Sequence, residues 1–199
     1  MNRSAFPVLR LAALAVTAVS LAGCGINAIP TKQETAKARF ADLQADYQRR
    51  ADLIPNLVQT VQAYAQQEHA VLTDVIKARA SATQVTLDPS KLSDPAAVQR
   101  YQAAQDSIGG ALGRLMVVSE RYPDLKSNQN FLALQSQLEG TENRIAVARR
   151  DYIESVRVYN TALRTFPTVL WAKTVFAGNK PMAEFTATDG SERPPTVKF

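Results

Sequence analysis

The chain has 199 residues, with 23 Lys and Arg against 18 Asp and Glu, and it contains one histidine and one cysteine. The length is sufficient for one domain with a hydrophobic core, and a net charge of +5 is too small to indicate nucleic-acid binding. A single histidine cannot supply the two Glu-x-x-His motifs of a di-metal helical bundle, and it leaves a hydrolytic triad without a credible base.

The first 23 residues are typical of a bacterial signal peptide. Two arginines precede the apolar segment LAALAVTAVSLAG (residues 11–23), which is too short to cross a hydrocarbon core of about 30 Å comfortably. The segment ends in Leu21-Ala22-Gly23-Cys24, which resembles the lipobox of bacterial lipoproteins. We therefore predict cleavage before Cys24 and attachment of diacylglycerol and a further acyl chain such as palmitate. The alternative is an ordinary secretory signal or an uncleaved anchor.

Lipidation of Cys24 would place the protein on the exported side of a membrane. Gly25 follows the cysteine where an inner-membrane retention signal would have Asp, so we expect the periplasmic face of the outer membrane in a cell with two membranes. No free thiol would remain for a disulfide, a metal or nucleophilic attack. The processed chain would keep 21 basic and 18 acidic residues, a mildly basic balance. Residues 24–30 are predicted to be a lipidated tether.

Residues 31–79 are predicted to form one long amphipathic helix. The segment has no glycine, and its apolar residues recur at steps of three and four, with Glu68 in one of these positions. Pro55 lies inside the segment and removes one backbone hydrogen bond, so a kink is expected there. Because the sequence DLIPN has little turn chemistry, we predict a bent continuous helix in preference to a hairpin.

Two further long helices are predicted after a turn-rich segment at residues 86–95. Ser93 or Asp94 can cap a second helix that begins at Pro95 and ends near residue 121. In the third helix, from about residue 128 to 165, large residues recur at every seventh position: Phe131, Leu138, Ile145, Tyr152, Tyr159 and Phe166. Smaller residues fill most intervening seam positions, a pattern typical of packed helices. Residues 168–176 can form a short final helix.

These elements predict an all-α protein, an antiparallel up-and-down bundle of three long helices and a short fourth one. The bundle is assigned to residues 31–177, and residues 178–199 are expected to be a flexible tail. Because the first helix would be longer than the second, its early apolar residues need cover from the tail, another subunit or a membrane. The candidate partner or oligomer face therefore comprises Phe40, Leu43, Tyr47, Val197 and Phe199.

The segment LEGTENRIAVARRDY (residues 138–152) is rich in charged residues, which could form either a reactive site or the border of a packing surface. On the seven-residue repeat, Glu142 and Arg149 lie beside the apolar seam, so we predict that they set the register between helices. Glu142 needs a partner across the bundle, and Arg79 and Arg114 are the candidates. Four glycines are predicted to allow a close helix crossing: Gly140 opposite Gly109, Gly110 and Gly113. A partner-binding face and acid–base or metal chemistry are the less favoured alternatives.

Two blocks of the sequence resemble the signature regions of the LemA family. They are QRRADLIPNLVQTVQAYAQQE (residues 48–68) and NFLALQSQLEGTENRIAVARRDYIESVRVYNTALRTFP (residues 130–167). The C-terminal sequence PPTVKF resembles the short motif that closes many members. The resemblance implies a mostly antiparallel helical bundle displayed from a membrane. Many members have an N-terminal transmembrane helix, whereas this sequence has a lipobox.

The resemblance also implies that the protein is not an enzyme, since the family has no established activity and no catalytic residues to transfer. One branch is linked to magnetosome membrane formation. We therefore expect a lipoprotein scaffold that binds another envelope protein, or a membrane-organising protein that binds itself. No catalytic residue, metal, cofactor, nucleic acid or small-molecule substrate is expected.

Overall fold

The computed structural model describes residues 25–186, and over this range the chain is helical without a β-strand. The predicted all-α class is confirmed. The described part contains six α-helices: α2 (Ala28–Tyr64), α3 (His69–Gln84), α4 (Pro95–Ser119), α5 (Pro123–Lys126), α6 (Gln129–Ala162) and α7 (Thr168–Lys173). The predicted signal peptide, Cys24, Val197 and Phe199 lie outside the described residues.

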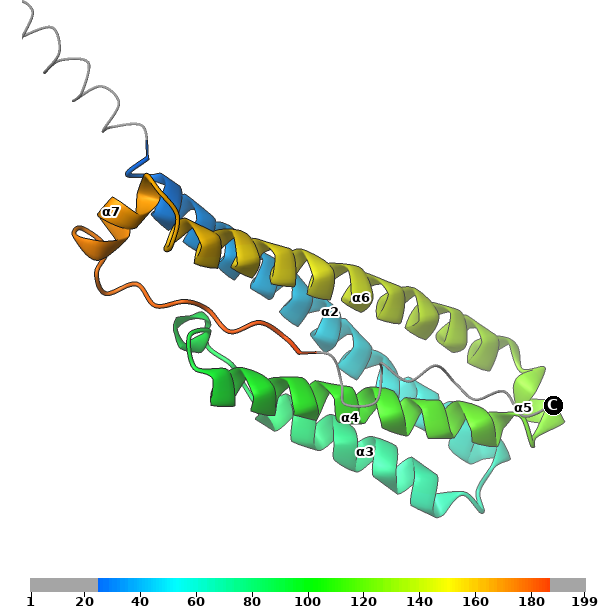
Figure 1. Ribbon diagram of the computed structural model, residues 1–199. Helices are drawn as coiled ribbons and strands as arrows, with labels where there is room; N and C mark the ends of the chain where they lie inside the picture. The colour runs from blue at the N-terminus through cyan, green and yellow to red at the C-terminus, as the bar shows by residue number, and fades with distance from the viewer. Residues whose placement is uncertain (1–24, 187–199) are drawn as a thin grey trace, which may run out of the picture.

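The four long helices form two pairs, α2 with α6 and α3 with α4 (Figure 1). Asp46 contacts Arg144 while Arg50 contacts Glu142, so α2 and α6 run in opposite directions. In the second pair, Asp74 near the start of α3 contacts Arg114 near the end of α4. Four long helices therefore replace the three that were predicted.

The prediction of one helix over residues 31–79 is wrong. α2 continues through Pro55 but ends at Tyr64, and after a short turn α3 folds back against it. The turn has neither glycine nor proline, and its contacts come from the distant α4–α6 connection. The Glu68 carboxylate accepts hydrogen bonds from Arg121 (2.9 Å) and from the Tyr122 hydroxyl (3.0 Å). Glu68, the charged residue within the apolar pattern, thus lies in the turn between α2 and α3.

Two hydrophobic clusters fill the bundle. One surrounds Tyr101, Tyr152 and Tyr159 near the start of α2, and the other surrounds Ile54, Ile108 and Leu138 beyond it. The large side chains at the seven-residue positions of α6 are buried in them as predicted, except Phe166, which follows the helix and is 80% exposed.

Phe40, Leu43 and Tyr47 are buried inside the chain, so they do not form a free docking face. The Phe40 ring lies 5.5 Å from the Tyr152 ring of α6 and 5.8 Å from the Tyr101 ring of α4. The predicted excess length of the first helix disappears because α2 ends at Tyr64, where its hydroxyl meets Asn128 at the start of α6, so α6 packs along the length of α2. The remaining predicted residues belong to α3. These aromatic side chains are core.

The ends of the domain are packed more closely than predicted. α2 begins at Ala28, within the supposed tether, and Ile29 is fully buried. At the other end, Met182 and Phe185 are buried in the first hydrophobic cluster, although the sequence suggested a tail from residue 178. Asn160 holds Met182 through two hydrogen bonds of 2.9 Å to its main chain.

Candidate functional site

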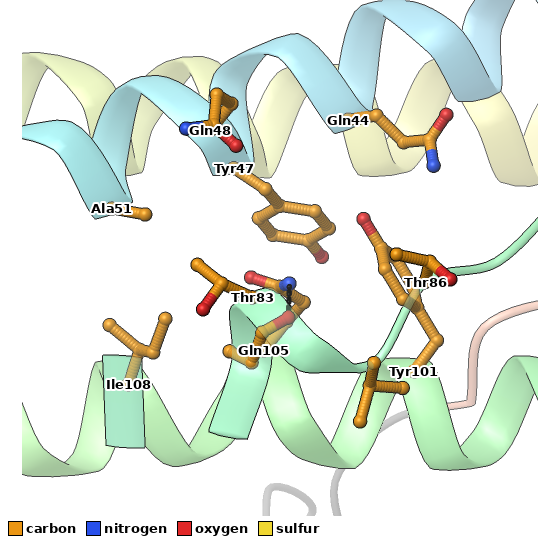
Figure 2. Close-up of a pocket in the computed structure, with 11 residues that line it drawn as sticks. Gln44, Tyr47, Gln48, Ala51, Thr83, Thr86, Tyr101, Gln105 and Ile108 are labelled. Atoms are coloured by element: carbon orange, nitrogen blue, oxygen red, sulfur yellow. Dashed lines mark hydrogen bonds between the residues drawn. The ribbon is translucent and has the colours of Figure 1, made fainter. Parts of the chain in front are cut away.

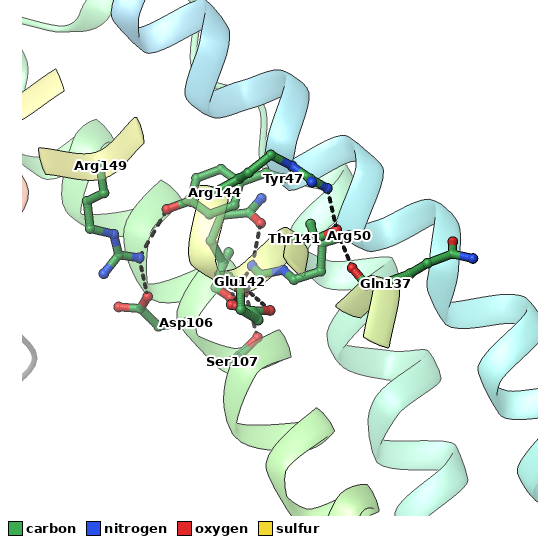
Figure 3. Close-up of polar contacts among 11 residues, drawn as sticks. Tyr47, Arg50, Asp106, Ser107, Gln137, Thr141, Glu142, Arg144 and Arg149 are labelled. Atoms are coloured by element: carbon green, nitrogen blue, oxygen red, sulfur yellow. Dashed lines mark hydrogen bonds and ion pairs between the residues drawn. The ribbon is translucent and has the colours of Figure 1, made fainter. Parts of the chain in front are cut away.

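Polar side chains from three helices meet between the two hydrophobic clusters (Figure 3). We call this group the central polar cluster and define it as Tyr47 and Arg50 of α2, Gln105 and Asp106 of α4, and Glu142 and Arg149 of α6. Each helix presents these residues on the side that faces its neighbours, since the adjacent seam positions are buried apolar residues. The cluster contains Arg50, the one charged residue that is buried among the described residues.

Arg50 is the centre of this cluster and is only 3% exposed. Its Nη1 group donates to both carboxylate oxygens of Glu142, at 3.2 and 3.3 Å. Its Nη2 group donates to the main-chain oxygen (2.8 Å) and the side-chain oxygen (3.1 Å) of Gln105. The guanidinium carbon lies 5.1 Å from the centre of the Tyr47 ring. One arginine thus connects α2, α4 and α6.

Arg149 makes a second connection between the same three helices. Its Nη2 group donates to the Asp106 carboxylate at 2.7 Å and to the Tyr47 hydroxyl at 3.0 Å. Burial raises the pKa of Tyr47 and outweighs the opposing effect of the neighbouring Arg149. Tyr47 therefore stays neutral at physiological pH and serves as a hydrogen-bonding group.

A small pocket of about 150 Å³ opens beside the cluster, between α2, α3 and α4 (Figure 2). Its polar lining consists of hydroxyl and amide groups, from Gln44, Tyr47, Gln48, Thr83, Thr86, Tyr101 and Gln105. Burial, and secondly the neighbouring Tyr47, raises the pKa of Tyr101 to about 12. These groups can hydrogen-bond water or a small neutral molecule. None of them is a base or an activated nucleophile at neutral pH.

The predicted glycine crossing between α4 and α6 is wrong. A methyl group added at Gly109 or Gly113 would meet no atom within 4 Å, and at Gly110 or Gly140 it would meet only an arginine side chain of the same helix, at 4.0 Å. Gly109 and Gly113 instead line an open groove of about 520 Å³ between α4 and α6, with Leu112 and Leu138 on its floor. Gly109 and Gly113 thus leave the space between α4 and α6 unfilled.

Glu139 and Glu142 of α6 do not converge in an enclosed reactive site. Glu139 lies on the groove between α4 and α6 and accepts a hydrogen bond from Gln135 of its own helix, at 3.0 Å. Glu142 reaches inward to Arg50. The two expected partners of Glu142 are used elsewhere, because Arg79 bonds to the main chain of Ala51 and Arg114 pairs with Asp74.

Sequence reasoning missed Arg50, Gln105 and Asp106. For Arg50 a signal was present, because it lies three positions after Tyr47 and four before Ile54, on the apolar stripe itself. An arginine in such a position must find buried partners or leave the core. Gln105 and Asp106 carried no comparable signal, because polar residues are common on a helix face beside a seam.

The described residues contain neither a metal-binding cluster nor a membrane-spanning helix. In the range 25–186, no group of three or more His, Cys, Asp and Glu side chains is placed to hold a metal ion. No helix within the same range is both long and apolar enough to cross a membrane.

Comparisons with known proteins identify the family of this chain. Residues 39–199 match the LemA family. The chain is 29% identical over 157 residues to the magnetosome protein MamQ of Magnetospirillum gryphiswaldense. It is 27% identical over 157 residues to magnetosome proteins MamQ 1 and MamQ 2 of Paramagnetospirillum magneticum. Each alignment covers 71% of this chain and 58% of the relative, so the chain spans little more than half the length of these relatives. Because the family match extends over most of its length, this chain belongs to the LemA family.

Proposed function

We propose that this protein is a membrane-anchored, non-enzymatic lipoprotein that acts as a helical scaffold or interaction module in the cell envelope. Family membership and the MamQ relatives support membrane association. The lipobox at residues 21–24 supports a lipid on Cys24, facing the exported side. Two or three acyl chains suffice for stable attachment, because each buried methylene contributes about 0.8 kcal/mol.

The observation that carries the scaffold role is the use of charge in the central polar cluster. Its two arginines and two carboxylates are engaged in ion pairs that join separate helices. Such pairs fix which helix faces meet, whereas a catalytic acid or base needs access to a substrate and a proton. The geometry therefore favours a rigid bundle whose exposed surfaces bind a partner.

The anchor is tested by mass spectrometry of the protein purified from its own cell membranes. We expect a mass for the processed chain that includes the acyl groups, and soluble protein after Cys24→Ser. An unmodified thiol at residue 24 in membrane-bound wild type would contradict the anchor. This result would leave the scaffold role open to its own test.

Partner binding is tested by photocrosslinking in cells. A photoreactive amino acid is placed at exposed apolar positions on three helices: Ile76 of α3, Val117 of α4, and Leu132 and Val147 of α6. We expect crosslinks to one envelope protein from adjacent positions only. Equal labelling by unrelated proteins at all four positions would contradict a specific partner. Deletion of residues 194–199 tests the C-terminal motif, and an unchanged partner set would remove that motif from the proposal.

A membrane-organising protein that assembles with itself is the second candidate, favoured by the names of the magnetosome relatives. Self-assembly cannot use Phe40 and Tyr47, since both are buried. It would have to use an exposed surface such as the groove between α4 and α6. Sedimentation of the protein without lipid decides this point, because a monomer at high concentration excludes it.

A further inference from the structure

The structure brings an exposed apolar patch next to the place where the chain emerges from the predicted anchor. The patch, which we call the α7 patch, consists of Phe166, Leu170 and Val175, which precede, lie in and follow helix α7. Their exposed fractions are 80%, 56% and 57%. The other strongly exposed large apolar side chains in the described residues are distributed over α2, α3, α4 and α6.

Trp171 fixes the position of the patch relative to the anchor. A methyl group built on Gly25 would lie 3.7 Å from the indole nitrogen of Trp171. Cys24 is bonded to Gly25, and consecutive Cα atoms are about 3.8 Å apart. The attachment point of the predicted lipid therefore lies within one residue of the α7 contact. Figure 1 shows α7 beside the start of α2, at one end of the bundle.

Further contacts hold α7 at this end of the bundle. Asn179, which follows the helix, donates to the side-chain oxygen of Gln33 in α2 at 3.1 Å. Trp171, Ala172 and Phe176 pack against the first hydrophobic cluster. The apolar residues of α7 are thus divided: one set anchors the helix on the core, and the α7 patch faces outward.

The charge of this region favours contact with an anionic surface. Residues 155–183 contain four basic residues and no acidic residue. Arg157 pairs with Glu154, whereas Arg164, Lys173 and Lys180 make no ion pair within the described part of the chain. Exposed apolar side chains with flanking cations are the composition of surfaces that lie in a membrane interface.

We propose that the α7 patch inserts into the interface of the bilayer that carries the anchor, with Arg164, Lys173 and Lys180 on anionic headgroups. This inference rests on the proposed membrane anchor and adds a second contact to it. Two contacts at one end restrict the angle between bundle and membrane, because a lipid chain alone permits rotation about the tether. The bundle would then project its opposite end, with α5, away from the bilayer.

The experiment uses Cys24 and Trp171, which are the one cysteine and the one tryptophan of the sequence. The chain that begins at Cys24 is purified without lipid, and its thiol is coupled to maleimide lipids in vesicles of phosphatidylcholine and phosphatidylglycerol. Brominated acyl chains in these vesicles quench a nearby tryptophan, and Trp171 is partly exposed and follows Leu170 of the α7 patch in the chain. We expect loss of Trp171 emission relative to vesicles without bromine, and a smaller loss when phosphatidylglycerol is omitted.

The variant Phe166→Ser/Leu170→Ser/Val175→Ser is expected to abolish the quenching. The matched control is Val117→Ser/Leu132→Ser, which removes exposed apolar groups near the α5 end and should quench like the wild type. Circular dichroism melting of each variant verifies that the bundle is folded. The variant Lys173→Gln/Lys180→Gln should reduce the difference between anionic and neutral vesicles.

Three results would overturn the proposal. One is no quenching of the tethered wild type, and another is equal quenching in the triple serine variant. The third is a change in emission that follows protein density on the vesicle instead of bromine content, which would identify a second copy as the occupant of the patch. Because the thiol is coupled chemically, these results are independent of whether Cys24 is lipidated in cells. Failure of the anchor proposal and failure of this inference are thereby distinguished.

Discussion

Arg79 of α3 donates its Nε–H group to the main-chain oxygen of Ala51 in α2, at 2.8 Å. Ala51 lies four positions before Pro55, and the proline nitrogen has no hydrogen to give to this oxygen. The arginine thus satisfies the acceptor that proline leaves free. The contact explains how α2 continues through Pro55, and it links α2 to the second helix of the hairpin.

This contact predicts a coupling between residues 55 and 79. Arg79→Met should lower the free energy of unfolding by about 1–2 kcal/mol, because a part-buried carbonyl loses its donor. In a Pro55→Ala background the new N–H group can bond to Ala51, so the same substitution should have a smaller effect. Urea denaturation of the four proteins measures the difference. Equal effects in both backgrounds would show that Arg79 acts elsewhere.

The ion pair of Arg50 with Glu142 should contribute measurably to stability. Glu142→Gln leaves a guanidinium of 4% exposure without its counter-charge, and we expect a loss of about 2 kcal/mol. The value is below that of a fully buried pair because the Glu142 side chain is 43% exposed. Glu154→Gln on the same helix is the matched control, since its pair with Arg157 is exposed. A loss equal to that of the control would remove Arg50 from the proposed role in register.

The glycines that line the groove between α4 and α6 should tolerate a larger side chain. Gly109→Ala and Gly113→Ala should each raise the free energy of unfolding by about 0.5–1 kcal/mol, because both positions have open space and glycine is a poor helix former. Thermal melts measure the change, and Ala103→Gly at an exposed position of α4 provides the calibration in the opposite direction. If both alanine variants were less stable than the wild type, the result would support the close helix crossing that was predicted from the sequence.

The segment after α7 should behave as part of the core. Phe185→Ala removes a ring that is 5% exposed and lies 5.2 Å from the Tyr152 ring, so we expect a loss of about 3 kcal/mol. Phe166→Ala removes the same group from an 80% exposed position and should change stability by less than about 0.5 kcal/mol. Denaturant melts compare the two. Similar losses would mean that Phe185 leaves the core in solution.

The raised pKa of Tyr101 predicts a loss of stability in alkaline solution. Burial keeps Tyr101 protonated in the folded protein up to about 12, whereas an exposed tyrosine in the unfolded chain loses its proton near 10. Between these values Tyr101 binds a proton in the folded state and not in the unfolded state, so this residue alone lowers the stability by about 1.4 kcal/mol per pH unit. Tyr101→Phe should lack this contribution. An unchanged slope between pH 10 and 12 would show that another group is responsible.

The sequence by itself determined the helical class, the start of α4 at Pro95 and the buried face of α6. These features depend on local chemistry. The Asp94 carboxylate accepts from the main-chain N–H groups of Ala96 and Ala97, two and three residues away. The seven-residue spacing on α6 places large side chains on one face of any helix that forms there.

Only the tertiary structure decided where the first helix ends and which charges pair. The hairpin at residues 65–68 is held by Arg121 and Tyr122, more than fifty residues later, and the local sequence contains no turn residue to reveal it. Likewise, Arg50 meets Glu142 because α2 and α6 pack along their length, whereas a bundle of three helices would place Arg79 or Arg114 nearer. A local pattern determines which face of a helix is apolar, and the free energy of the whole packed bundle determines which helices share that face.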